Sequence, residues 1–178
     1  GNATIVAVYQ GQKIKRKLHI AGKKKIALDA GHQSRGDSRK EPVGPGSSVR
    51  KARVAGGATG VASRVPEYKF TLSVAKRLQK ELKKRGYEVY MVRTKNNVNI
   101  SNKKRAMLAN KSGADIYIRI HGDSSGSRGV KGASIFYPSA RNPYVSRLSR
   151  SSKRLSKKLL NAYCKKTVSY THLTLPRT

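Results

Sequence analysis

Short apolar runs alternate with longer amphipathic stretches along this chain of 178 residues. Residues 26–32 form a short apolar run that ends in Gly and His, which is typical of a buried strand followed by a tight turn. Residues 87–93 and 115–121 are two further strand-like runs, and residues 132–137 are compatible with a fourth. Residues 1–22 alternate more weakly around a Gly-Gln pair, which favours a β-hairpin or the tail of a preceding segment.

Three stretches show the spacing of three and four that predicts helices. Residues 66–86 begin with Pro and end with a basic turn followed by Gly, so Glu67 should lie in the first turn of that helix. Ser101 is a suitable N-cap for a helix over residues 101–111. Residues 145–162 keep one apolar face. The basic residues opposite that face are Lys153, Arg154, Lys157 and Lys158.

The alternation of strand and helix predicts an α/β fold of three layers, with helices on both faces of a largely parallel sheet. Residues 33–65 are rich in Gly, Ser and Arg and have no apolar period, so we expect them to be a long functional loop without secondary structure. Residues 23–167 should form one domain. The chain has no run of eighteen apolar residues, which excludes a transmembrane helix.

The net charge adds the strongest constraint on function. The chain has 40 Lys and Arg residues but only 8 Asp and Glu residues, which gives a formal net charge of +32. Such an excess requires a polyanionic partner or environment. Nucleic acid is the usual partner, but the anionic polymers of a bacterial wall would satisfy the same electrostatics. Aromatic residues make up only 6% of the chain and Trp is absent, which argues against the stacking platforms of nucleic-acid binding.

Two histidines stand at strand ends, His32 after the first strand and His121 after the third. Ligands gather at the carboxyl ends of strands in open α/β sheets, and Glu67 can be aimed at the same edge. Two imidazoles and one carboxylate form a known catalytic zinc set, in which the metal acidifies water and polarises a carbonyl. By itself, Glu67 would be a first-turn carboxylate favoured by the helix dipole. Asp29 either orients a ligand or only fixes the turn.

The remaining His and Cys residues carry no motif. His19 and His172 are expected to be plain surface residues. Cys164 is the single cysteine, which excludes an internal disulfide, and we expect it only to pack.

Four motifs follow one another in a specific order: LDAGH at 28–32, VPE at 65–67, RAMLAN at 105–110, and GAD through Ile-His at 113–121. Over residues 24–166 the chain resembles the zinc-dependent N-acetylmuramoyl-L-alanine amidase family. The resemblance implies that His32, Glu67 and His121 hold Zn²⁺. It also implies cleavage of the amide between the lactyl group of N-acetylmuramic acid and L-alanine of the stem peptide.

The chain departs from the family at two places. Residues 119–123 read Arg-Ile-His-Gly-Asp where the family often has Ser-Ile-His-Ala-Asn, a change beside the metal but not of a ligand. The family continues into a final strand with a glutamate as general acid/base, whereas no acidic residue follows Asp123 here. We therefore expect the final strand to be missing and the catalytic residue to be unassigned. Residues 168–178 should be a non-native tail or, alternatively, an exposed strand.

These observations predict a peptidoglycan amidase that binds zinc, peptidoglycan and anionic wall polymers, acts extracellularly or in the cell wall, and is a monomer without a specific nucleic-acid partner. Two alternatives stay open: a basic nucleic-acid-binding protein, and a zinc- and wall-binding protein without turnover. Metal content distinguishes the first alternative, and turnover of muropeptide the second. If the chain is active, Glu41 and Asp123 are the first candidates for the base.

Overall fold

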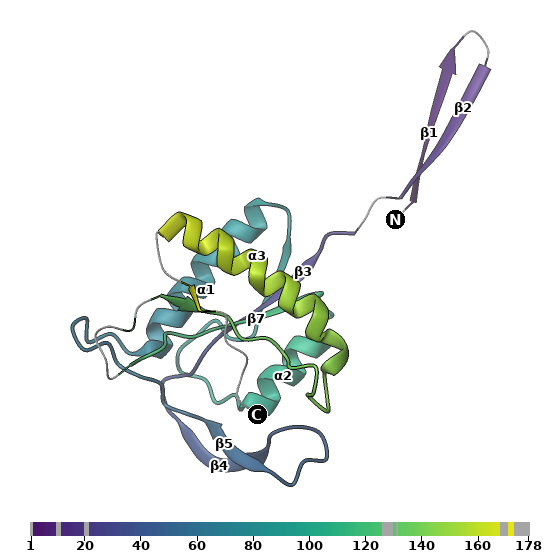
Figure 1. The fold of residues 1–178 in the computed structure, drawn as a ribbon. Helices are drawn as coiled ribbons and strands as arrows, with labels where there is room; N and C mark the ends of the chain where they lie inside the picture. Colours follow the sequence, from purple (N-terminus) through teal and green to yellow (C-terminus); the bar gives the residue numbers. More distant parts are fainter. Residues whose placement is uncertain are drawn as a thin grey trace. The chain divides into compact units, whose positions relative to one another are not determined.

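The computed structural model of the chain divides into two compact units, Gly1–Glu41 with Val49–Gly122 and Pro42–Ser48 with Asp123–Thr178. Figure 1 labels most of the helices and strands described below. The described residues are 2–9, 12–19, 22–125, 130, 132–167 and 171–172.

A three-stranded parallel sheet lies at the centre of the first unit, in the order β6–β3–β7. Its strands are β3 (Lys25–Ala30), β6 (Glu88–Met91) and β7 (Ile116–Ile120). The middle strand is buried along nearly its whole length because it has a neighbour on each side and helices on its faces. The three strands predicted from apolar runs are therefore confirmed.

The helices of this unit begin and end close to where their capping residues predict. Helix α1 covers Glu67–Lys84 with Pro66 at the N-cap, and Gly86 follows it with a φ of +83°. Helix α2 covers Asn102–Lys111, and the Ser101 side chain accepts a hydrogen bond from a backbone N–H in its first turn. Of these two N-cap residues, Ser101 satisfies a helix-end N–H through its side chain, whereas Pro66 makes no such hydrogen bond.

Helices cover both faces of the sheet. Leu72 and Ala75 of α1 pack against Ala30, whereas Ala109 of α2 packs against Ala27. Successive side chains of a strand point to opposite faces, so Ala27 and Ala30 lie on opposite sides of the sheet. The three-layer α/β arrangement is confirmed for this unit.

Residues 33–65 are not the structureless loop that their composition predicts. They contain β4 (Asp37–Pro42) and β5 (Arg50–Val54), which form a two-stranded sheet. Strand β4 is mostly exposed and charged, so it has no apolar alternation that could reveal it. Its stability comes from backbone pairing and from an ion pair 3.1 Å long between Asp37 and Arg53 of β5.

The N-terminal residues form an antiparallel pair, β1 (Asn2–Tyr9) with β2 (Gln12–His19), as the hairpin interpretation predicts. Asn2 lies opposite His19 in this register. The side chains of the segment, including the His19 imidazole, lie outside the described residues.

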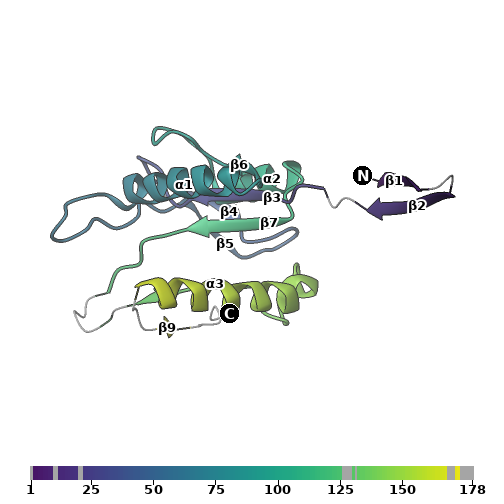
Figure 2. The ribbon, with the colours of Figure 1, turned by 90° about the horizontal axis from the view of Figure 1, so that it is seen from above.

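The second unit contains β8 (Ala133–Ser134), the 3₁₀ turn η1 (Ser146–Leu148), α3 (Ser149–Thr167) and β9 (Thr171–His172). Figure 2 shows the full length of α3, the helix predicted over residues 145–162. The strand expected at 132–137 is only two residues long, and it pairs with β9 instead of joining the main sheet.

The predicted non-native tail at 168–178 falls outside the described residues apart from the backbone of β9, so the His172 side chain is also outside them. Cys164 of α3 is free and partly buried. Within the parts of the chain that the structure describes, the helices are too short or too polar to cross a membrane.

Candidate metal centre

The three residues predicted to bind metal come together in the first unit. His32 follows β3, Glu67 opens α1, and His121 follows β7. One potential ligand atom from each lies within 4.8 Å of the others, and the two imidazole centroids are 4.7 Å apart. They meet because β3 and β7 are parallel neighbours whose carboxyl ends share one edge of the sheet.

Glu67 is the centre of this cluster. Its Oε2 lies 3.2 Å from Nε2 of His32, and its Oε1 lies 3.0 Å from Nδ1 of His121. The backbone N–H groups of Ala58 and Gly122 donate to the two carboxylate oxygens at 3.0 and 2.9 Å. Burial acts to raise the pKa of Glu67, but these hydrogen bonds outweigh it and the pKa is lowered. The carboxylate is therefore ionised at neutral pH.

His32 has a left-handed backbone conformation with a φ of 58°. This conformation costs a non-glycine residue about 1 kcal/mol. Its Nδ1 lies 2.8 Å from the carbonyl oxygen of Ala55, which can only accept a hydrogen bond, so Nδ1 carries the proton. Nε2 is therefore the ring nitrogen that faces the cluster, 3.2 Å from Oε2 of Glu67, and in the neutral ring with its proton on Nδ1 this nitrogen carries the lone pair that a metal ligand needs.

His121 is more accessible, with 42% of its side chain exposed. Burial lowers the pKa of its imidazole, and the hydrogen bond with Glu67 opposes this without reversing it. A neutral imidazole is the form that binds a metal ion. The exposure of His121 leaves the cluster open on one side.

Two glycines allow the ligands to approach one another. A Cβ added to Gly31 would lie 2.5 Å from Cε1 of His121, and one added to Gly57 would lie 2.9 Å from Cγ of His32. Gly57 also has a φ of +81°, which side chains rarely adopt. Glycine is therefore required at position 31, because His121 lies in close contact with the end of β3.

The donor set fits a divalent metal ion. It consists of one ionised carboxylate and two imidazoles, each of which can offer one ring nitrogen once that nitrogen is unprotonated, and three protein ligands leave a coordination position for water or substrate. The cluster His32–Glu67–His121 could therefore hold a metal ion.

The other acidic candidates have hydrogen-bond partners outside the His32–Glu67–His121 cluster. Asp29 is fully buried in β3, where its carboxylate contacts Arg105 and the Tyr117 hydroxyl instead of a histidine. Glu41 accepts a hydrogen bond from a backbone N–H at the start of α2, where the helix dipole favours a negative charge. Asp123 is exposed and accepts from the N–H of the next residue.

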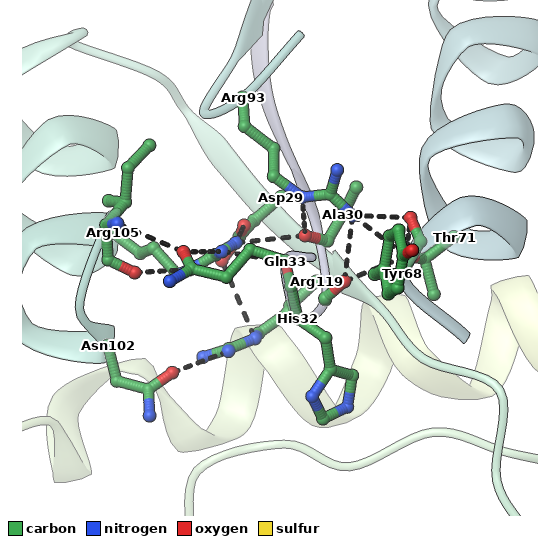
Figure 3. A network of polar contacts seen from close by, with 12 residues as sticks. Asp29, Ala30, His32, Gln33, Tyr68, Thr71, Arg93, Asn102, Arg105 and Arg119 are labelled. Atoms are coloured by element: carbon green, nitrogen blue, oxygen red, sulfur yellow. Dashed lines mark hydrogen bonds and ion pairs between the residues drawn. The ribbon is translucent and has the colours of Figure 1, made fainter. Parts of the chain in front are cut away.

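Sequence reasoning missed two arginines beside this site. Arg93 is 2% exposed and Arg105 is 0% exposed, and both contact the end of β3 (Figure 3). Arginine is usually at the surface, so composition gives no reason to expect buried guanidinium groups. The available signal was the position of Arg105 at the head of the RAMLAN motif.

Comparison with known families gives one match to a family model, described as N-acetylmuramoyl-L-alanine amidase, over residues 26–175. Among curated protein sequences, none matches the chain.

Solved structures show the same fold. The apo form of the N-acetylmuramyl-L-alanine amidase Ami1 from Mycobacterium abscessus is 25% identical, with a TM-score of 0.66 over 81% of this chain and 68% of that one. The catalytic domain of the amidase CwlV from Bacillus (Paenibacillus) polymyxa var. colistinus is 22% identical, with a TM-score of 0.62 over 85% and 69%. The amidase from Clostridium difficile 630 is 23% identical, with a TM-score of 0.65 over 89% and 72%.

Proposed function

The chain belongs to the N-acetylmuramoyl-L-alanine amidase family, and we propose that it hydrolyses peptidoglycan with a zinc ion held by His32, Glu67 and His121. The reaction is hydrolysis of the amide between N-acetylmuramic acid and L-alanine. The observation that carries the zinc proposal is the convergence of three suitable donor atoms within 4.8 Å. Among the described residues, no other group of His, Cys, Asp and Glu side chains converges in this way.

Zinc at this cluster would lower the pKa of water and polarise the carbonyl of the lactyl amide. The chain's own residues prepare the cluster for that role. The Ala55 carbonyl fixes the tautomer of His32, and backbone N–H groups hold both oxygens of Glu67. Because Glu67 is the one carboxylate in the cluster and serves as a ligand, a separate group must move the proton to the leaving amine. That group stays unassigned.

Metal analysis tests the ligand assignment. The purified protein should contain one zinc per chain, and His32→Ala, Glu67→Gln and His121→Ala should each lose most of it. His19→Ala is the matched control because this histidine lies outside the motifs. An equal zinc content per chain in the parent and in all three ligand variants would contradict the assignment. Hydrolysis of purified muropeptide then separates an active amidase from a zinc- and wall-binding protein without turnover.

The positive charge supports a second part of the proposal, attachment to anionic wall polymers. Helix α3 carries no acidic residue, and one exposed face of it is a basic stripe. The stripe consists of Arg150, Lys153, Arg154, Lys157, Lys158 and Lys165. At 1.5 Å per residue it is about 22 Å long, which fits an extended chain of anionic groups. It contains no aromatic side chain on which a nucleic-acid base could stack.

Competition between wall sacculi and duplex DNA or RNA tests this attachment. Binding to either partner should weaken with salt, because both release counterions. At about 0.15 M salt, where the Debye length is roughly 8 Å, the protein should prefer sacculi. Preference for nucleic acid would support the alternative of a basic nucleic-acid-binding protein. We further propose that the protein acts extracellularly or in the cell wall, which fractionation of the producing cells would check. We also propose that it is a monomer, which analytical ultracentrifugation would check.

A further inference from the structure

Arg105 uses every N–H group of its buried side chain. Its Nε donates to the Ile100 carbonyl, its Nη1 to Asp29 and the Ala30 carbonyl, and its Nη2 to the His32 carbonyl and the Gln33 side chain (Figure 3). A guanidinium has five N–H donors, so none is left over. A fully satisfied planar fork of this kind can occupy only one orientation.

Arg93 approaches the same strand end from a different position. Its Nε donates to the Ala30 carbonyl at 2.8 Å, and its Nη2 donates to the Gly31 carbonyl at 3.0 Å. Its other contacts are to further carbonyls, to the Thr71 hydroxyl and to the Asn96 side chain. None of these partners is a carboxylate, so within the part of the chain that the structure describes the oxygens that hold Arg93 are neutral.

The two arginines together hold three consecutive carbonyl groups, those of Ala30, Gly31 and His32. These residues lie where the chain leaves the sheet and the strand ladder no longer supplies all the partners. The next step of the chain is the left-handed conformation of His32, which is uncommon for a residue with a side chain. The hydrogen bond from Arg105 to the His32 carbonyl, 2.8 Å long, fixes one side of that conformation.

Burying two guanidinium groups costs desolvation free energy that an apolar core would not. Both guanidiniums are buried, yet among the described residues Asp29 is the one carboxylate in contact with either of them, at 2.6 Å from Arg105. Packed apolar residues of similar volume are often at least as stabilising as buried ion pairs. Strained backbone and costly charges tend to persist where they serve a site.

We propose that Arg105 and Arg93 are positioning residues of the metal centre, which act through the carbonyls of Ala30, Gly31 and His32 to hold the His32 imidazole facing Glu67. The proposal rests on the proposed function, because the gain from this positioning is binding of the metal ion. Partners that orient a ligand from outside the coordination sphere typically change metal affinity by about 10–100-fold when removed.

Lysine is the informative replacement at both positions. It keeps the positive charge but has three donors on a flexible stem, so it cannot reproduce a fork that contacts five acceptors. A substitution that removed the positive charge would also reduce repulsion of the bound zinc ion. That gain in zinc affinity could hide the loss caused by a misplaced His32 imidazole. Arg85→Lys is a matched control, since Arg85 also contacts a carbonyl and a carboxylate, both of Glu81, but is exposed at the far end of α1.

The experiment measures zinc dissociation constants by competition with a chromophoric chelator. Arg105→Lys should bind zinc about 10–100-fold more weakly than the parent, Arg93→Lys should also bind more weakly, and Arg85→Lys should stay within about twofold. Circular dichroism of each metal-free variant checks the fold. If Arg105→Lys does not fold, Arg93→Lys and Thr71→Val, which removes one hydroxyl that contacts both Arg93 and Gly31, supply the comparison.

A second readout uses the metal-free protein. Histidine-ring NMR signals, assigned through His→Ala variants, should show a shifted or broadened His32 signal in Arg105→Lys and an unchanged one in Arg85→Lys. Folded Arg105→Lys and Arg93→Lys with the parent's zinc affinity and the parent's His32 signal would overturn the proposal. Failure of the parent to bind zinc would contradict the metal site itself, and the NMR comparison would still decide whether the arginines position His32.

Discussion

Replacing Asp29 with Asn, which exchanges one carboxylate oxygen for an amide nitrogen, should strongly destabilise this protein. The Asp29 carboxylate is fully buried and lies 2.6 Å from Nη1 of Arg105, whose side chain is also fully buried. The Tyr117 hydroxyl donates to the other carboxylate oxygen at 2.7 Å. The substitution keeps the shape and removes the one full negative charge that Arg105 contacts.

The expected loss follows from this burial. Breaking a buried ion pair by removing one partner typically costs about 3–5 kcal/mol, because the remaining charge stays buried without compensation. Solvent screening does not reduce the effect here, since both side chains are 0% exposed. For a domain of this size about 1 kcal/mol lowers Tm by roughly 2–4 °C, so Asp29→Asn should lower Tm by roughly 6–20 °C.

Thermal and urea unfolding of the metal-free protein measure this loss. Glu81→Gln is the matched control, because Glu81 forms ion pairs of 3.3 Å with Lys84 and 2.8 Å with Arg85 while all three side chains are exposed. Its Tm should stay near that of the parent. A decrease of less than about 1 kcal/mol in the free energy of unfolding for Asp29→Asn would refute the reasoning. It would show that the carbonyl groups around Arg105 stabilise its charge without a carboxylate.

Three further predictions concern a cap, a glycine and a carboxylate. Ser101→Ala should lower the free energy of unfolding by about 1 kcal/mol in urea titrations, because a first-turn N–H of α2 loses its acceptor. Gly57→Ala should reduce zinc content and Tm together, since the new Cβ would lie 2.9 Å from Cγ of His32; an unchanged zinc content would contradict the contact. The hydrogen bond from Arg39 holds the pKa of Asp37 at about 2, below the usual 3.8. Its contribution to stability is therefore present above about pH 4 and lost as the pH falls toward 2, so Asp37→Asn should flatten the decline of stability in that window.

Local patterns in the sequence predict most of the first unit. Apolar runs mark β3, β6 and β7, and the run is most buried in the middle strand β3, because a strand covered on both faces needs mainly apolar side chains. Ser101 marks the start of α2, because an N-cap depends on only a few neighbouring residues. Within the metal cluster, the strand-end positions of His32 and His121 already predict one shared sheet edge.

Tertiary contacts decide the rest. Strands β4 and β5 follow one another closely in the chain, but they have no apolar alternation, so only their backbone hydrogen bonds to each other reveal them. The burial of Arg93 and Arg105 is also decided in three dimensions, by carbonyl groups that lose their strand partners where β3 leaves the sheet. A sequence shows which residues carry charge, but only the folded chain brings two of them to the carbonyls of Ala30, Gly31 and His32, because these contacts join residues more than sixty positions apart.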